Sequence, residues 1–235
     1  MVTFHLLHVQ QMPILEQLRL EEALLRSDER NWCLINEGTP PAIVMGISGK
    51  AEELISPQAA VGIPVIRRFS GGGCVVVDEN TLFVTFICQK EVHPFPPYPE
   101  PILRWCAGFY SFVPGFHVRE NDYVIGERKC GGNAQYIRKD RWLQHTCFLW
   151  DYRPERMGLL LHPPKSPQYR EGRSHEEFLC CLRQYLPSKE SFVAGVKKNI
   201  YKSNEVKEIS TEEATRVCQV PHRQSVVAEN SNTFY

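Results

Sequence analysis

The sequence has no apolar run of the roughly 18 to 20 residues that a membrane-spanning helix needs. Its first thirty residues contain five acidic side chains and no basic segment followed by an apolar core, unlike a secretory signal or an organellar transit segment. It also has no excess charge of either sign, with 27 Lys and Arg against 27 Asp and Glu. These absences predict a cytoplasmic protein that has neither a membrane nor a nucleic acid as its partner.

Two further kinds of site are missing. The nine cysteines include no Cys-x-x-Cys pair and their number is odd, so neither a zinc site nor a disulfide framework is indicated. The chain contains neither Gly-x-x-x-x-Gly-Lys-Ser/Thr nor Gly-x-Gly-x-x-Gly, the glycine motifs that hold nucleotide phosphates at the start of a helix. With 235 residues, 43% of them hydrophobic, we expect one large domain or one domain with an appendage.

The hydrophobic pattern predicts helices and strands over much of the chain. We expect helices over 13–26, 51–54 and 102–112, and strands over 32–35, 42–46, 61–69, 74–78 and 81–87. Five prolines between residues 90 and 101 predict an extended surface linker, which includes His93.

One segment joins two arginines to three glycines between two predicted strands. Glycine permits positive φ and close backbone approach, so the N–H groups of Gly71, Gly72 and Gly73 can converge on an anion. Arg67 and Arg68 add charged donors that suit a carboxylate or a phosphate. A tight turn is the simpler interpretation, but a turn does not need two cations at the end of an apolar strand. The segment is therefore a candidate anion-binding loop.

A second informative segment, residues 119–150, has the pattern strand, glycine turn, strand, turn, strand. Lys129 follows the glycine turn and precedes Gly131 and Gly132, so its ammonium can project from a crowded backbone into a cleft. A lysine is usually a solvated surface charge. The small neighbours and the amide of Asn133 favour a lysine that faces a ligand at least as strongly.

The two segments together resemble the lipoate-protein ligase A family, within the wider biotin/lipoate ligase superfamily. The resemblance covers most of residues 10–155, and the order and spacing of the motifs match. It rests on Arg67-Arg68-Phe69-Ser70-Gly71-Gly72-Gly73 with Asp78 and Asn80, then Asn121-Asp122, Gly126-x-x-Lys129-x-Gly131-x-Asn133-Ala134 and Leu143-x-His145.

The resemblance implies an α/β (α+β) fold, a mixed β-sheet flanked by helices, with the catalytic domain over residues 1–200. It implies that Lys129 is the catalytic residue, whose ammonium stabilises two anions as they come together. Asp122 would hold Mg²⁺ through a carboxylate oxygen. The residues that it implies for binding substrate or adenylate are Arg67, Arg68, Ser70, Gly71, Gly72, Gly73, Asn121, Asp122, Gly132, Asn133, Ala134 and His145.

The implied activity is ATP-dependent activation of lipoate or octanoate to an acyl-adenylate, followed by transfer of the acyl group to a lysine of a lipoyl carrier domain. ATP and Mg²⁺ are therefore the implied cofactors. The implied partners are lipoyl domains of 2-oxoacid dehydrogenases or the glycine-cleavage H protein. Because such acceptors also occur in mitochondria and plastids, an organellar location without an obvious transit peptide is the alternative to the cytoplasm.

Departures from the family pattern leave other functions open. Cys130 stands where a serine is common, so its thiol is a candidate nucleophile for an ATP-independent octanoyl or lipoyl transferase. His145-Thr146-Cys147 replaces His-Gly-Thr, which removes a glycine that would permit close backbone approach, and His145 is then structural in the simpler interpretation. A non-catalytic lipoate-binding protein is the alternative from a different class. A biotin ligase ranks lower, because its Arg-Gly-Arg-rich loop is absent.

The residues after 150 are expected to contribute little further core. Ser174 and Glu177 form a capping box at the start of a helix predicted over 174–185. Residues 201–235 are predicted to be a tail with a short helix starting at Ser210. Because too little apolar sequence remains for another core, we expect the full accessory C-terminal domain of bacterial ligases to be absent, with an accessory protein as its replacement.

Overall fold

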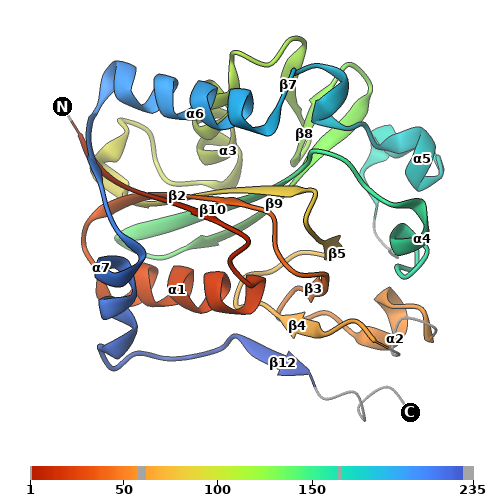
Figure 1. Cartoon of the computed structure of the whole chain (residues 1–235), viewed down its shortest axis with the longest axis horizontal. Coiled ribbons are helices and arrows are strands. Elements are labelled where there is room, and N and C mark those ends of the chain that lie inside the picture. Colours follow the sequence, from red (N-terminus) through yellow and green to blue (C-terminus); the bar gives the residue numbers. More distant parts are fainter. Residues whose placement is uncertain (1, 58–61, 163–165, 230–235) are drawn as a thin grey trace.

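The computed structural model describes residues 2–57, 62–162 and 166–229. Its centre is a mixed sheet with the strands β1 (Thr3–Gln10), β2 (Asn31–Glu37), β6 (Thr81–Gln89), β7 (Phe116–Arg119), β8 (Asp122–Ile125), β9 (Arg128–Ile137), β10 (Arg141–Leu149) and β11 (Glu205–Glu208). Their order across the sheet is β11-β1-β2-β6-β10-β9-β8-β7. Figure 1 shows this sheet edge-on. β1 runs parallel to β11 and β2, and the other neighbouring strands are antiparallel.

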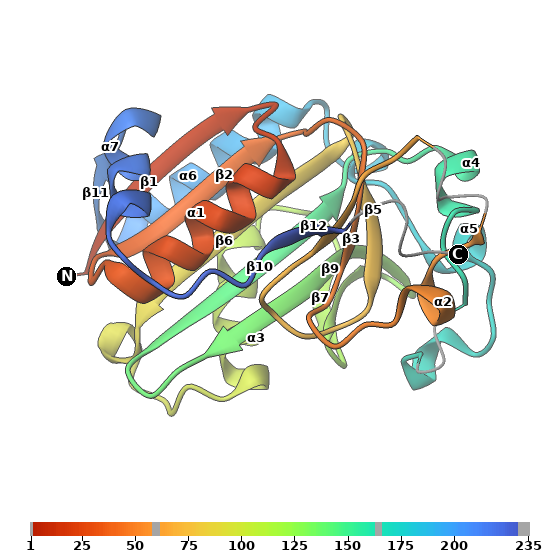
Figure 2. The same ribbon diagram turned by 90° about the horizontal axis from the view of Figure 1, so that it is seen from below.

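A smaller sheet lies at one end of the large one. Its strands are β3 (Ala42–Met45), β4 (Val65–Arg67), β5 (Cys74–Val77) and β12 (Val227–Glu229), in the order β12-β4-β3-β5. Figure 2 shows this sheet beside α1 (Ile14–Ser27), on the same side of the large sheet. The glycine-rich segment joins β4 to β5, so the predicted connection from strand to strand is confirmed. Val61, the first residue of the strand expected over 61–69, lies outside the described residues.

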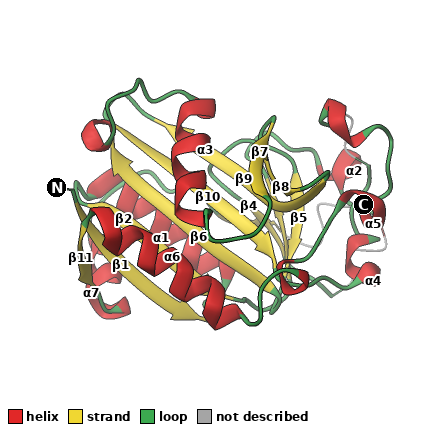
Figure 3. Ribbon diagram, turned by 90° about the horizontal axis from the view of Figure 1, so that it is seen from above, coloured by secondary structure: helices red, strands yellow, loops and turns green. Residues whose placement is uncertain are grey.

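Helices cover both faces of the large sheet (Figure 3). The helices besides α1 are α2 (Ala51–Leu54), α3 (Pro99–Ala107), α4 (Pro154–Met157), α5 (His175–Phe178), α6 (Lys189–Ser203) and α7 (Thr211–Thr215). Short 3₁₀ turns cover Lys90–Val92, Gly108–Tyr110, Gln168–Arg170, Leu182–Gln184 and Arg216–Gln219. α3 and α6 cross one face, while α1 and α7 cover the other (Figure 1). In the described part of the chain, no helix is both long and apolar enough to cross a membrane.

The large sheet separates two apolar clusters. The cluster beneath α3 and α6 is aromatic, and in it Tyr110 packs edge-on against Phe148 with ring centroids 4.7 Å apart. The cluster beneath α1 is mainly aliphatic and includes Leu18 and Leu24. Burying one such leucine contributes about 1.5 to 3 kcal/mol. The predicted first helix is thus confirmed, and its leucine stripe faces the sheet.

The helix predicted over 174–185 is wrong in length. Its capping box between Ser174 and Glu177 is present, but α5 ends at Phe178. The next residues are extended, because Leu179 bridges to Lys129 and Cys180 N donates a hydrogen bond to Lys129 O at 2.9 Å. The backbone pairing of Leu179 and Cys180 with Lys129, near the start of β9, therefore ends the helix at Phe178.

Two other expectations need correction. The sequence analysis missed α6, which is capped by the Ser188 side chain and buries Phe192, Val196 and Ile200 at helical spacing. The linker expected over 90–101 is shorter, because α3 begins at Pro99, a residue type that suits a first helical turn. His93 is buried rather than part of an exposed linker, and it accepts a hydrogen bond from Trp142 Nε1 at 3.0 Å.

The residues after 200 contribute to both sheets. β11 extends the large sheet beside β1, and β12 pairs with β4. The short helix expected from Ser210 is confirmed as α7. The buried carboxylate of Glu22 holds the segment that enters β12, accepting hydrogen bonds from Ser225 N at 2.8 Å and Val226 N at 3.3 Å. Residues 230–235 of the expected tail lie outside the described residues.

Replacing Glu22 with glutamine should destabilise the fold by about 2 kcal/mol, because the charged acceptor of two backbone N–H groups and the charged partner of Arg26 is lost. Urea unfolding measures the effect. Glu16→Gln, an exposed change on the same helix, is the control and should shift stability by less than about 0.5 kcal/mol. Equal effects of the two changes would show that Glu22 does not hold the C-terminal segment.

Candidate active site

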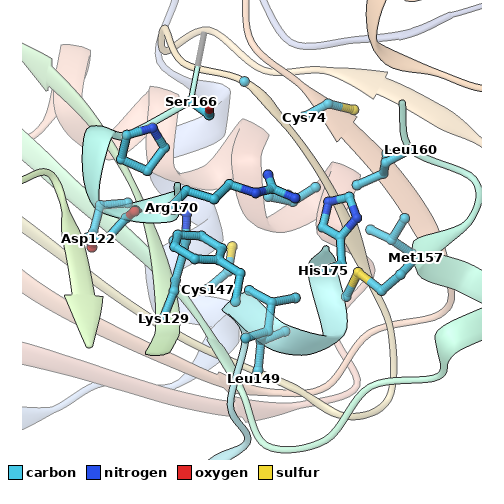
Figure 4. Close-up of a pocket in the computed structure, with 18 of the residues that line it drawn as sticks. Cys74, Asp122, Lys129, Cys147, Leu149, Met157, Leu160, Ser166, Arg170 and His175 are labelled. Carbon is cyan, nitrogen blue, oxygen red and sulfur yellow. Dashed lines mark ion pairs between the residues drawn. The ribbon is translucent and has the colours of Figure 1, made fainter. Parts of the chain in front are cut away.

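A cavity of about 510 Å³ lies between the small sheet and the strands β8, β9 and β10 (Figure 4). Its walls come from the start of β5, from the facing sides of β8 to β10, and from the segment that contains α4 and α5. Polar and charged side chains on the walls include Asp122, Lys129, Arg170 and His175. The two segments that the sequence analysis singled out therefore meet at one cavity.

A narrower cavity of about 120 Å³ continues from the first. Both are lined by Gly73, Cys74, Val75, Lys129, Gly132, Asn133 and Cys147, which therefore form the junction between them. Beyond the junction the walls are mostly apolar, with Ile14, Val44 and Val77 among them. A ligand with a polar head and a slender apolar tail suits this pair of cavities.

A β-bulge sets which side chains face the cavity. Tyr123 on β8 pairs with Gly131, but the next residue, Val124, pairs with Lys129, so Cys130 is the extra residue. Strand residues alternate between faces, and one inserted residue reverses that alternation. Lys129 consequently lies on the same face as Gly132, whose missing Cβ would be 3.8 Å from Lys129 Nζ.

The bulge has the opposite effect on the neighbouring thiol. Cys130 is fully buried in the aromatic cluster, on the face away from the cavity. Its Sγ donates to Tyr123 O at 3.4 Å, and burial raises the pKa of the thiol well above its ordinary value. The structure therefore does not bring Cys130, the candidate nucleophile of the sequence analysis, to the cavity.

Lys129 is held in place by an ion pair. Its Nζ is 2.7 Å from Asp122 Oδ1, and both side chains are mostly buried. The other oxygen of Asp122 accepts a hydrogen bond from the Tyr169 hydroxyl at 2.9 Å. Burial and the adjacent Asp122 carboxylate raise the pKa of Tyr169, so this hydroxyl remains a donor. The arrangement fixes one ammonium at the junction of the cavities.

The glycine segment forms a close-packed edge of the site. A Cβ on Gly46 would lie 2.2 Å from Gly72 O, and Gly72 itself has φ of 107°. Both positions therefore require glycine. Gly73 lines the main cavity, while Gly71 and Gly72 line a separate hollow together with Asn121, Asn133 and Ala134. Ser70 is buried, and its carbonyl accepts a hydrogen bond from Ile47 N at 3.0 Å.

The two arginines are largely engaged with the protein itself. Arg67 forms an ion pair with Glu229 of β12 and donates to the Gly49 carbonyl, and it lines none of the cavities described above. Arg68 lines the narrow cavity, but its Nη2 donates to Gly71 O at 2.8 Å. Of the two predicted anion-binding arginines, only Arg68 is therefore brought to the site.

His145 belongs to a buried polar network. Its Nδ1 is 3.0 Å from the carboxylate of Glu21 on α1, which also accepts a hydrogen bond from Thr85. Its Nε2 is 3.2 Å from Cys147 Sγ. Burial alone would lower the pKa of His145, but Glu21 and the Cys147 sulfur raise it to about 10. The imidazole is thus held in its charged form between a carboxylate and a thiol at the cavity wall.

Several residues at the cavity wall or directly behind it were not predicted. Glu21 carries no local signal, because it is one of three glutamates on an amphipathic helix. Arg170, buried at 5% exposure, and His175 reach the cavity only through the fold of the segment after β10. Cys147 appeared in the sequence analysis only as part of an altered motif. The two-residue spacing from His145 is the signal that could have found it, because strand residues i and i+2 share a face.

The Mg²⁺ site expected from the sequence has Asp122 as its only named ligand. In residues 2–57, 62–162 and 166–229, no group of three or more His, Cys, Asp or Glu side chains is arranged to hold a metal ion. Both oxygens of Asp122 already have protein partners, Lys129 and Tyr169.

A family model described as the lipoyl protein ligase A/B catalytic domain matches residues 13–205. Among curated relatives, the inactive lipoate–protein ligase 2 of Plasmodium falciparum is 25% identical, over 83% of this chain and 68% of the relative. The lipoate-protein ligase LplJ of Bacillus subtilis is 27% identical, over 80% of this chain and 60% of the relative. A substantial part of each relative therefore has no counterpart in this match.

Solved structures share the fold. A bi-partite lipoate protein ligase from Thermoplasma acidophilum, described with its E2 lipoyl domain, has a TM-score of 0.76 at 16% identity, covering 93% of this chain and 91% of that one. A lipoate-protein ligase A bound with ATP has a TM-score of 0.72 at 18% identity, covering 93% and 92%. At these identities the likeness concerns the fold alone. It confirms the predicted mixed sheet flanked by helices and the ligase-like architecture.

His145→Gln should destabilise the protein in a pH-dependent way. Because the pKa of His145 is raised from 6.5 to about 10, its charged contact with Glu21 contributes fully below pH 6.5 and fades as the pH rises toward about 10. The loss should be about 3 kcal/mol at pH 6 and smaller at pH 9. Chemical unfolding across this pH range measures it. The exposed change His117→Gln is the control, and a loss that does not vary with pH would contradict a charged His145.

Proposed function

Because the chain belongs to the lipoyl protein ligase A/B catalytic domain family, we propose that it is an enzyme that activates lipoate or octanoate with ATP and transfers the acyl group to a lysine of a lipoyl carrier domain. The observation that carries this proposal is the Lys129 ammonium, fixed by Asp122 at the junction of a wide cavity and a narrow one. A medium-chain acid with a nucleotide beside its carboxylate matches that shape.

The acyl tail would lie in the narrow cavity, against Ile14, Val44 and Val77. Its carboxylate would then reach the junction, next to Lys129. The nucleotide would occupy the wide cavity, where Arg170 supplies a second cation for phosphate oxygens. The ATP complex of a structural neighbour supports a nucleotide in this fold.

In the first step, a carboxylate oxygen attacks the α-phosphorus of ATP and pyrophosphate leaves. The carboxylate and the α-phosphate are both anions and repel each other. A fixed ammonium in a partly dehydrated site lowers this repulsion most at the point where the two charges meet. In the second step, a neutral lysine amine of the carrier domain attacks the carbonyl of the mixed anhydride. AMP leaves, an amide forms, and the amine proton is released to solvent. Lys129 serves as an electrostatic clamp in both steps.

Magnesium would accompany the nucleotide. Mg²⁺ is commonly bound through one or two carboxylates together with substrate phosphates and water. Asp122 is the carboxylate beside Lys129 and fits that limited role, although its oxygens also orient Lys129 and accept from Tyr169.

The proposed acceptor is a lipoyl domain of a 2-oxoacid dehydrogenase or the glycine-cleavage H protein. The Thermoplasma ligase is described as bi-partite and together with an E2 lipoyl domain, which supports both this class of acceptor and a separate accessory protein for the present chain. The name of the Plasmodium relative includes the word inactive, so catalysis needs a direct test.

Incubation with lipoate or octanoate, Mg-ATP and an apo-lipoyl domain should add one acyl group to that domain, as measured by intact mass. Lys129→Ala should reduce the rate by about 100-fold or more, because the transition state loses its fixed cation. Lys139→Ala, an exposed lysine in the turn between β9 and β10, is the matched control and should retain the rate. Tight lipoate binding without any transfer would instead favour a non-catalytic lipoate-binding protein or a missing accessory partner.

A further inference from the structure

A third cavity, of about 190 Å³, lies beside the wide and narrow cavities of the candidate active site. The amide side chains of Asn121, Asn133 and Gln135 line it, so we call it the amide hollow. Its remaining walls are Gly71 and Gly72 of the glycine segment, Ala134 of β9, and Pro99 and Leu103 of α3. Segments that are distant in the sequence therefore meet at this hollow.

The amide hollow lies at an open edge of the large sheet. Neighbouring residues of a strand point to opposite faces, so a cavity that touches Asn133, Ala134 and Gln135 must lie at the edge of β9. β10 occupies one edge of that strand, and β8 pairs with the other edge as far as Gly131. In the part of the chain that the structure describes, no strand pairs with this edge beyond Gly131. Solvent and a partner can therefore reach the hollow from this side.

The glycine segment connects the amide hollow to the junction of the wide and narrow cavities. Gly71 and Gly72 line the hollow, while Gly73 lines both other cavities. Apart from neighbours in the chain, a Cβ at Gly71 or Gly73 would have no heavy atom within 4 Å, so the space along this segment is open. On the opposite side, Asn133 lines all three cavities. The hollow and the junction therefore adjoin each other.

The amide hollow stays free when both other cavities are occupied. In the proposed ligase reaction, the nucleotide fills the wide cavity and the acyl tail fills the narrow one. The amine that attacks the acyl carbonyl then needs a separate route to the junction. The hollow adjoins the junction and opens at the edge of the sheet, so it provides that route.

The walls of the amide hollow suit an amine. None of the described residues that line it is charged, so no carboxylate keeps a lysine protonated and no cation repels it. Gln135 donates hydrogen bonds from Nε2 to Pro99 O at 2.9 Å and to Gln144 Oε1 at 2.6 Å. Its own oxygen accepts no hydrogen bond from a described residue, which leaves it as an acceptor for an amine N–H.

Two exposed apolar side chains adjoin different walls of the hollow. Tyr98 is 66% exposed and directly precedes Pro99. Ile47 is 41% exposed and follows Gly46, which packs against Gly72. Aromatic side chains are enriched where protein partners bind, and they often contribute most of the binding energy. An apolar contact surface thus lies beside an uncharged entrance.

We propose that the amide hollow is the entrance for the acceptor lysine of the lipoyl carrier domain, and that the carrier docks on Tyr98 and Ile47 beside it. This inference rests on the proposed function, to which it adds the binding surface for the protein partner. The occupant of the hollow is a primary amine on a flexible four-carbon stem, which is slender enough to pass between two backbone segments.

The transfer step balances along this route. The lysine ammonium loses one proton to solvent at the open edge of the sheet, and the neutral amine passes between Gly72 and Asn133 to the junction. Its nitrogen attacks the carbonyl carbon of the acyl-adenylate, a C–N bond forms, and the C–O bond to the phosphate breaks. AMP leaves with the electron pair of that bond. The second amine proton is released to solvent through the hollow.

The first test compares two acceptors for the same acyl-adenylate, using the full chain with lipoate and Mg-ATP. An apo-lipoyl domain, measured by intact mass, needs the docking surface, whereas hydroxylamine, measured as lipoyl hydroxamate, does not. Tyr98→Ser should raise the KM for the lipoyl domain about 10-fold or more and leave hydroxamate formation unchanged. Serine is a favoured residue at this N-cap position, so α3 is retained. Tyr201→Ser, an exposed tyrosine on α6, is the control and should change neither reaction.

A pair of charge variants tests the hollow itself. Gln135→Lys places a cation in the entrance and should lower kcat/KM for the lipoyl domain about 10-fold or more, because like charges repel. Gln135→Glu replaces the same amide with an anion and should not cause this loss. Hydroxamate formation should be unchanged in both variants, because hydroxylamine is small and uncharged at neutral pH.

The outcomes separate this inference from the proposed function. If the unchanged protein forms no hydroxamate, the proposed function fails and this inference fails with it. If hydroxamate forms but Tyr98→Ser leaves the carrier KM unaltered, the inference alone is overturned. Equal losses in Gln135→Lys and Gln135→Glu, or a fall in hydroxamate formation that matches the fall in transfer, would also overturn it, because Gln135 would then have a structural role.

Discussion

The β-bulge at Cys130 is the constraint on which the site depends. Without the extra residue, alternation along β9 would direct Lys129 into the aromatic cluster and Cys130 into the cavity. Interactions on both faces of the sheet stabilise the bulge. Cys130 packs in the aromatic cluster on one face, and Lys129 forms an ion pair with Asp122 of the neighbouring strand on the other. Gly131 completes the arrangement, since a Cβ there would lie 2.9 Å from the Phe148 ring. Because of this one inserted residue, the Lys129 ammonium and not the Cys130 thiol faces the cavity.

A buried polar layer connects the opposite wall of the site to the first helix. Glu21 accepts hydrogen bonds from Gln17 and Thr85 as well as contacting His145, so its charge is compensated within the protein. Gln17 in turn accepts from Asn36 at 2.9 Å. Burying a carboxylate is costly unless such partners surround it. The network therefore fixes α1 against β2, β6 and β10, and it delivers a charged imidazole to the cavity wall at the same time.

The sequence predicted those features that depend on local chemistry. The glycine segment and the Lys129 block have recognisable residue types at fixed spacing, and α1 has leucines at helical spacing. The bulge could not be predicted, because Cys130 and Lys129 are both compatible with either face until the pairing with Tyr123 and Val124 is known. The end of α5 depends on a backbone pairing with Lys129, and the contact of His145 with Glu21 joins residues 124 positions apart. These are properties of the folded chain, not of any segment.

The proposed function explains why an ammonium is held where the two cavities meet. A free carboxylate has no leaving group, so ATP must supply AMP, and the demand on the protein is to hold anions together, which a fixed ammonium meets. The neighbouring strand completes the junction, because Cys147 pairs with Gly132, three residues from Lys129. The pairing of β9 with β10 therefore places the ammonium at the entrance of the narrow cavity.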